Sequence, residues 1–89
     1  AVGALTRNTA VEYGDTGIRI NAICPGFIDT PLLIESVAEE DRAGLAAANP
    51  MNRLGTPDEV ANAALWLASD ASSFVTGMLF SIAGGWTAI

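Results

Sequence analysis

The apolar residues at the start of the chain follow a helical spacing. Ala1 to Tyr13 is predicted to be a helix, because its apolar positions recur about every 3.6 residues on one stripe. Gly14 suits the residue that closes this helix, where a positive φ is favourable. No capping residue precedes Ala1, so we expect the chain to begin inside a helix. The stripe consists of Val2, Leu5, Thr9, Ala10 and Val11.

A second helix is predicted from Thr56 to Ala68. Thr56 can accept a hydrogen bond from the third backbone N–H of the helix, and Glu59 can bond back to complete a capping box. The run from Val60 to Ala68 is apolar almost all the way round, and such a helix is normally buried on every face. A chain of 89 residues offers little to bury it. We therefore expect missing chain or a partner subunit to cover it.

Two short segments have the composition of strands. Ile18 to Cys24 is rich in β-branched residues and ends at Pro25 and Gly26, and Met78 to Ile82 ends before a glycine pair. Between them, residues 32–48 read as a weaker helical stretch broken near Ala38, which begins at the cap Thr30. A strand that returns through helices favours a parallel pair.

Composition narrows the possible partners. The net charge is −6, with ten acidic residues, four scattered arginines and no lysine or histidine. Nucleic-acid binding needs clustered cations, so this class is rejected, as is an anionic membrane surface. No apolar run reaches the 18 residues of a membrane span, and the usual zinc patterns are absent, so no metal site is expected.

The proportion of apolar residues suggests that the chain is a piece of something larger. Apolar residues make up 51% of the sequence and charged residues only 16%, although a small domain has much surface to cover with polar groups. A compact, alanine-rich helical domain is the alternative. Nothing at the N-terminus resembles an export signal, so a reducing cytoplasm is the expected location. Cys24 is then expected to be a small buried hydrophobe, not a redox group.

A series of short segments runs in order along almost the whole chain: Leu5–Arg7, Glu12–Gly14, Gly17–Ile23, Pro25–Pro31, Arg53–Ala61, Leu65, Leu67–Asp70, Ser72–Gly77 and Gly84–Gly85. This series closely resembles the short-chain dehydrogenase/reductase family, and its oxoacyl-reductase-like branch in particular. No one segment is decisive, but the series is specific. One departure is Ala83, where the family commonly has an aspartate.

The resemblance implies an α/β fold, with residues 1–89 as the C-terminal part of one doubly wound, Rossmann-type NAD(P)-binding domain. It implies that the family's glycine-rich phosphate loop, catalytic serine and Tyr-x-x-x-Lys pair lie upstream, with the lysine two residues before Ala1. Tyr13 is not that tyrosine, because its fourth successor is Gly17. No catalytic residue is therefore assigned, and the chain alone is expected to be inactive. The cofactor would be NAD or NADP, bound weakly or not at all by these residues alone.

The candidate cofactor site follows the first strand. Ligands of open α/β sheets bind beyond the carboxyl ends of strands, and Gly26 lets backbone approach a ligand closely. Taken locally, this is an ordinary strand exit with a helix cap. The resemblance implies that the segment lies along the nicotinamide, with backbone groups of Ile28 at the carboxamide and the Thr30 hydroxyl supporting the carboxamide or pyrophosphate. The candidates are Pro25, Gly26, Ile28 and Thr30.

Other residues have two possible roles. Leu32, Leu33 and Met51, with Leu54, could line a substrate pocket or belong to the core. Asn21 could order a catalytic water, but bonding to a neighbouring loop is the favoured reading. Small residues beside large ones on the second helix favour a subunit interface, to which Trp66 and Phe80 would contribute packing. The interface candidates are Ala61, Ala64, Leu65, Trp66, Ala68 and Phe80.

Two functions remain open. The first is part of an NAD(P)(H)-dependent oxidoreductase that interconverts an alcohol and a ketone or aldehyde. The second is a non-enzymatic module, derived from such a protein, that only packs or assembles. In either case we expect a homo-oligomer, a dimer or tetramer, or association with the missing part of the parent chain.

Overall fold

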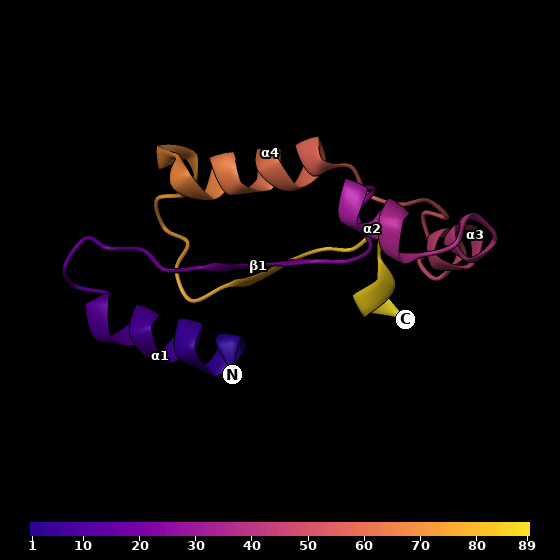
Figure 1. Ribbon diagram of the computed structural model, residues 1–89. Helices are drawn as coiled ribbons and strands as arrows, with labels where there is room; N and C mark the ends of the chain where they lie inside the picture. The colour runs from indigo at the N-terminus through magenta and orange to yellow at the C-terminus, as the bar shows by residue number, and fades with distance from the viewer.

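The computed structural model describes residues 1–89 and has a three-layer arrangement. Two helices lie on opposite sides of a pair of strands, and two shorter helices lie beyond one end of the pair (Figure 1). Short 3₁₀ turns follow the fourth helix and the second strand. The elements are α1 (Val2–Tyr13), β1 (Ala22–Pro25), α2 (Pro31–Ser36), α3 (Glu39–Ala47), α4 (Pro57–Ala68) and β2 (Leu79–Ile82).

The two strands are parallel neighbours, as predicted. Their register pairs Ala22 with Leu79 and Pro25 with Ile82. The chain between them passes through α2, α3 and α4, and α4 contacts both strands from one side. α1 contacts β1 and lies on the other side (Figure 1). Helices on both faces of a parallel pair are the arrangement of a doubly wound α/β sheet.

β1 is shorter than the predicted strand of residues 18–24, because a side chain replaces the first steps of the ladder. The Asn21 amide nitrogen donates to the Val75 carbonyl at 3.1 Å, and the Asn21 amide oxygen accepts from the Met78 N–H at 3.0 Å. Regular pairing begins only at Ala22, whose N–H donates to the Met78 carbonyl. The structural role predicted for Asn21 is confirmed.

Gly14 follows the last residue of α1 as the predicted C-terminal cap, but the positive φ predicted for it is wrong. Its φ is −59°, so the chain continues in a right-handed turn, and the positive φ of 85° falls at Gly17. Thr16 accounts for the difference: its hydroxyl donates to the Tyr13 carbonyl at 2.6 Å and satisfies the end of α1 without a left-handed residue. The break between the central helices, in contrast, lies at Val37 and Ala38, as predicted.

Few side chains are buried. Five of the 89 residues are buried, and only Ala10 and Ala63 among them are hydrophobic, in a molecule measuring 49 × 24 × 24 Å. The buried contacts of α1 and α4 are therefore made by small residues, and many of the larger apolar side chains of the helices are exposed. Cys24 is exposed and not buried as predicted, because β1 is hydrogen-bonded along only one edge.

Arg19 connects the entrance of β1 to the end of α4. Its guanidinium donates to the carbonyls of Leu67, Ser69 and Val75 at 2.8, 3.2 and 3.2 Å, and to the Ser72 hydroxyl at 3.1 Å. The last carbonyls of a helix lack partners within it and favour a cation. Arg19 supplies both the donors and the charge, and so holds α4 against the strands.

We predict that Arg19→Met destabilises the protein by about 1.5–3 kcal/mol, the range for hydrogen bonds made by a charged group. Urea unfolding measures this change. Arg7→Met is the matched control, because Arg7 is exposed and has no hydrogen-bond partner, and its effect should stay within about 0.5 kcal/mol. Equal effects of the two substitutions would contradict the anchoring role of Arg19.

Candidate functional site

The exit of β1 lies close to the exit of β2. The Gly26 N–H donates to the Ile82 carbonyl at 3.0 Å, one step beyond the regular ladder. A Cβ added to Gly26 would lie 3.0 Å from both the Cα and the Cβ of Ala83. Glycine is therefore needed because two backbones leave the sheet side by side.

The segment after Gly26 extends the parallel pairing to a new partner. Ile28 forms a parallel bridge with Gly55, in the loop before α4. The Gly55 N–H donates to the Phe27 carbonyl at 3.0 Å, and the Asp29 N–H donates to the Gly55 carbonyl at 2.8 Å. These two bonds fix the backbone on both sides of Ile28.

Thr30 ends this segment and begins α2. Its hydroxyl oxygen accepts from the Leu33 N–H at 3.3 Å, and Pro31 occupies the first helical position, so the predicted cap is confirmed. The hydroxyl proton of Thr30 has no acceptor within the chain. It is free to donate to a ligand.

A hollow of about 350 Å³ lies beside this segment. It brings together three of the four cofactor candidates and two of the three substrate candidates, while Pro25 lies one residue before it. Every residue that lines it is uncharged. The lining residues are Gly26, Phe27, Ile28, Thr30, Leu32, Leu33, Ser36 and Val37.

Met51 lies elsewhere, in a second hollow of about 280 Å³ that also contains Arg53, Glu59 and Gly84. Phe27 lines both hollows, so they are neighbours. Leu54 is half-buried and lines neither. The substrate candidates are therefore divided between two adjacent surfaces.

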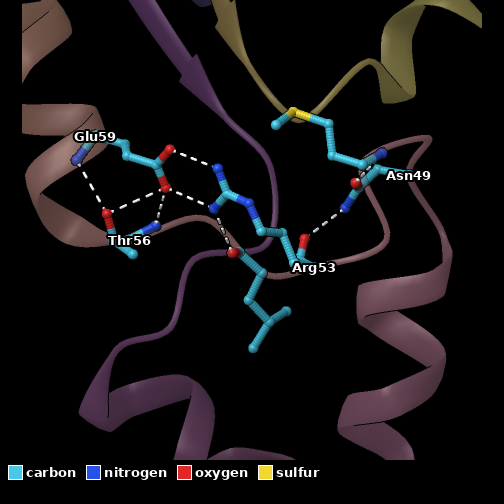
Figure 2. A network of polar contacts seen from close by, with 6 residues as sticks. Asn49, Arg53, Thr56 and Glu59 are labelled. Atoms are coloured by element: carbon cyan, nitrogen blue, oxygen red, sulfur yellow. Dashed lines mark hydrogen bonds and ion pairs between the residues drawn. The ribbon is translucent and has the colours of Figure 1, made fainter.

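Three residues that line the second hollow, Asn49, Arg53 and Glu59, belong to a polar network (Figure 2). Arg53 makes a two-pronged ion pair with Glu59, with N–O distances of 2.8 and 2.7 Å. The Glu59 carboxylate also accepts from the backbone N–H of Thr56 at 2.9 Å, and Thr56 accepts from the Glu59 N–H, so the predicted capping box is confirmed. The hydrogen bonds from Arg53, followed by that from the Thr56 backbone, lower the pKa of Glu59 to about 2.

Asn49 supports the loop that carries Arg53. It is 7% exposed, and its amide donates to the Arg53 carbonyl at 2.9 Å and accepts from the Met51 N–H at 3.0 Å. A Cβ on Gly84 would lie 2.6 Å from its Oδ1, so this contact requires glycine at the exit of β2. Asn49 thus connects the loop to the second strand.

Sequence reasoning missed the roles of Asn49 and Arg53. The capping-box pattern located Glu59, but nothing in that pattern identifies the arginine that shares its carboxylate. Arg53 reaches Glu59 because the loop reverses at Asn52, which has a φ of 54°. An asparagine tolerates this left-handed conformation better than most residues, and that was the one available signal.

The interface candidates lie mostly on the exposed surface of α4, where five of the six are exposed. Phe80 is half-buried on β2, and its ring meets the ring of Trp66 edge-on at a centroid distance of 5.9 Å. Their assignment to an interface stays a prediction.

No group of histidine, cysteine, aspartate and glutamate side chains has the arrangement of a metal site. None of the helices has both the length and the apolar character needed to cross a membrane.

Comparison with known proteins agrees with this geometry. A family profile described as enoyl-(acyl carrier protein) reductase matches residues 1–87. The chain is 49% identical over 88 residues to cis-4-hydroxycyclohexanecarboxylate dehydrogenase of Sinomonas cyclohexanicum, covering 99% of this chain and 35% of that protein. It is also 49% identical to 3beta-hydroxysteroid dehydrogenase 1 of Eggerthella lenta, covering 97% of this chain and 33% of that protein.

Solved structures give the same result. The crystal structure of 3-oxoacyl-[acyl-carrier protein] reductase from Brucella melitensis superposes with a TM-score of 0.88 and 48% identity, covering 94% of this chain and 31% of that one. A parallel strand pair with helices on both faces and a hollow at its carboxyl ends is the arrangement of part of a Rossmann-type α/β fold. The chain belongs to the short-chain dehydrogenase/reductase family. It spans about a third of the length of these relatives.

We predict that Gly26→Ala destabilises the protein by about 1–3 kcal/mol, as expected when extra volume enters a close contact. Gly44→Ala is the control, because nothing lies within 4 Å of the added Cβ in the interior of α3. That substitution should stabilise the protein by about 0.5–1 kcal/mol. Urea unfolding of both variants tests the contact, and a neutral Gly26→Ala would contradict it.

Proposed function

We propose that the chain is the C-terminal part of an NAD(P)(H)-dependent oxidoreductase that interconverts an alcohol and a ketone or aldehyde by hydride transfer. One observation carries the proposal: the residues that resemble the family's nicotinamide-side segment share a hollow at the carboxyl ends of the strands with two leucines suited to an apolar substrate. The names of the relatives, all dehydrogenases or reductases, support the same reaction class.

The residues of the hollow fit the nicotinamide end of such a cofactor. Its lining is uncharged, which suits a neutral carboxamide better than a phosphate. When bound, the nicotinamide supplies or accepts the hydride. Pro25 and Gly26 bring the backbone to the ring, backbone groups of Ile28 meet the carboxamide, and Thr30 donates its free hydroxyl proton to the carboxamide or pyrophosphate.

Leu32 and Leu33 would contact the substrate and keep water from the reacting carbon, and Met51 would approach from the neighbouring hollow. Two relatives are named for a hydroxycyclohexane and a hydroxysteroid, whose hydroxyl groups are on saturated rings. We therefore propose a secondary alcohol on an alicyclic ring as the substrate class.

The test uses the full-length protein, assayed with NAD⁺ or NADP⁺ and cyclohexanol. We expect turnover by the full-length protein and none by residues 1–89 alone. A general acid–base group contributes about 10²–10⁴-fold to a rate, and none is assigned in this chain. Turnover by residues 1–89 above that of a heat-denatured sample would refute their catalytic incompetence. A full-length protein that binds neither dinucleotide would refute the proposed function.

A Thr30→Asn variant separates the proposed cofactor contact from the helix cap. Asparagine caps helices about as well as threonine or better, so unfolding should change little. Its side chain cannot place a hydroxyl proton at the same point, so the dissociation constant for NADH or NADPH should rise. Thr30→Ser retains both groups and should bind like the wild type.

The alternative, an assembly module, is favoured by an exposed apolar surface on α4. Leu65 is 69% and Trp66 40% exposed, and burying one large apolar side chain contributes about 1.5–3 kcal/mol. We propose that this surface meets a second copy or another part of the parent chain. The dinucleotide-binding assay above distinguishes a pure assembly role from an enzyme.

Sedimentation of residues 1–89 at micromolar concentration tests the assembly proposal. We expect species larger than the 9.2 kDa monomer. Leu65→Asp should shift the distribution toward the monomer, because it places a charge on the proposed contact. A single folded 9.2 kDa species for the unsubstituted chain would refute self-association.

A further inference from the structure

The backbone around Ile28 is held by one residue of another loop. Gly55 donates to the Phe27 carbonyl and accepts from the Asp29 N–H, and these bonds form the only bridge outside the two strands. In the proposed function, this backbone lies along the nicotinamide. The position of the proposed cofactor segment therefore depends on where Gly55 lies.

Gly55 in turn lies between residues bound to one ion pair. On one side, an Arg53 nitrogen donates to the Leu54 carbonyl at 3.1 Å. On the other side, the Thr56 N–H donates to the Glu59 carboxylate at 2.9 Å. The two terminal guanidinium nitrogens of Arg53 donate to the two carboxylate oxygens of Glu59 (Figure 2). Only Gly55, between these anchored residues, points its backbone groups at Phe27 and Asp29.

The helix cap alone does not account for Arg53. Thr56 and Glu59 complete the capping box between themselves, so α4 can begin without the arginine. The two-pronged geometry is the one in which arginine holds a carboxylate most specifically. The backbone of Arg53 is also held in place, because Asn49 donates to its carbonyl and packs against Gly84.

We infer that the Arg53–Glu59 pair is a positioning pair, which fixes Gly55 and, through it, the backbone of Phe27 to Asp29 that binds the nicotinamide. This inference rests on the proposed function for its ligand. The two side chains are 46% and 41% exposed, and exposed pairs contribute little to global stability. Loss of the pair should therefore loosen the backbone locally, at the Ile28–Gly55 bridge, with little change in global stability.

The test compares Arg53→Met with wild type in the full-length protein by amide hydrogen exchange and by titration with NADH and NADPH. Exchange of the Gly55 and Asp29 amides should accelerate about two- to fivefold, the range for an exposed ion pair. The dissociation constant of the dinucleotide should rise by a similar factor. Amides inside α4 should keep their wild-type rates, because the capping box remains.

Two further variants and one change of salt concentration serve as controls. Glu59→Gln keeps a capping side chain but loses the charge, and should match Arg53→Met. Arg7→Met, which removes an arginine without a hydrogen-bond partner, should match wild type. Salt at 1 M, where the screening length is about 3 Å, should accelerate exchange at the two amides in wild type and have little effect on Arg53→Met.

The inference is overturned if Arg53→Met leaves the exchange of Gly55 and Asp29 unchanged, or if it accelerates only the amides of α4. It is also overturned if exchange accelerates while the dinucleotide affinity of the variant equals that of a binding-competent wild type. A wild-type protein that binds no dinucleotide contradicts the proposed function instead. In that case, faster exchange of the Gly55 and Asp29 amides in Arg53→Met still supports the conclusion that the Arg53–Glu59 pair fixes this backbone. Unchanged exchange overturns that conclusion.

Discussion

Backbone pairing between β1 and β2 joins the two halves of the chain, and the remaining structure is arranged around it. Buried side chains contribute little, since only two hydrophobic residues are buried. The pairing runs from Ala22 with Leu79 to Pro25 with Ile82, and the Ile28–Gly55 bridge continues its direction beyond the strands. Because parallel strands end at the same edge, this register places the exit of β1 and the loop before α4 beside one another.

Polar side chains secure both ends of the pairing. At its start, Asn21 and Arg19 bind the backbone of the segment that leads into β2. At its carboxyl end, Asn49 rests on Gly84 and holds the loop of Arg53. Each of these groups bonds to backbone atoms, so the geometry of the site depends on directional hydrogen bonds more than on close packing.

The sequence predicted what depends on local pattern. The capping box at Thr56, the cap at Thr30 and the break near Ala38 are set by neighbouring residues, and all three were found. Apart from the parallel strand pair and the bonding of Asn21 to a neighbouring loop, contacts between distant segments were not readable. Cys24 was expected inside because of its residue type, but its exposure depends on which edge of β1 is paired.

Composition alone did not predict the structural roles of the four arginines. Their scatter excluded a nucleic-acid footprint, but three of them have a shared structural role at irregular backbone. Arg19 binds carbonyls at the end of α4, and Arg42 binds those of Ile34 and Val37 at the end of α2. Neither helix ends in glycine, so a guanidinium supplies the donors that a left-handed cap would otherwise provide.

Arg53 extends this role from a helix end to the site. It binds the Leu54 carbonyl as the other two bind theirs, but it also holds Glu59 at the first turn of α4. Arg53 lies in the neighbouring hollow, while the lining of the hollow beside Ile28 and Thr30 is uncharged. In the proposed function, this uncharged surface would take a neutral ligand group beside Ile28 and Thr30, and Arg53 would act indirectly, by keeping the backbone in place.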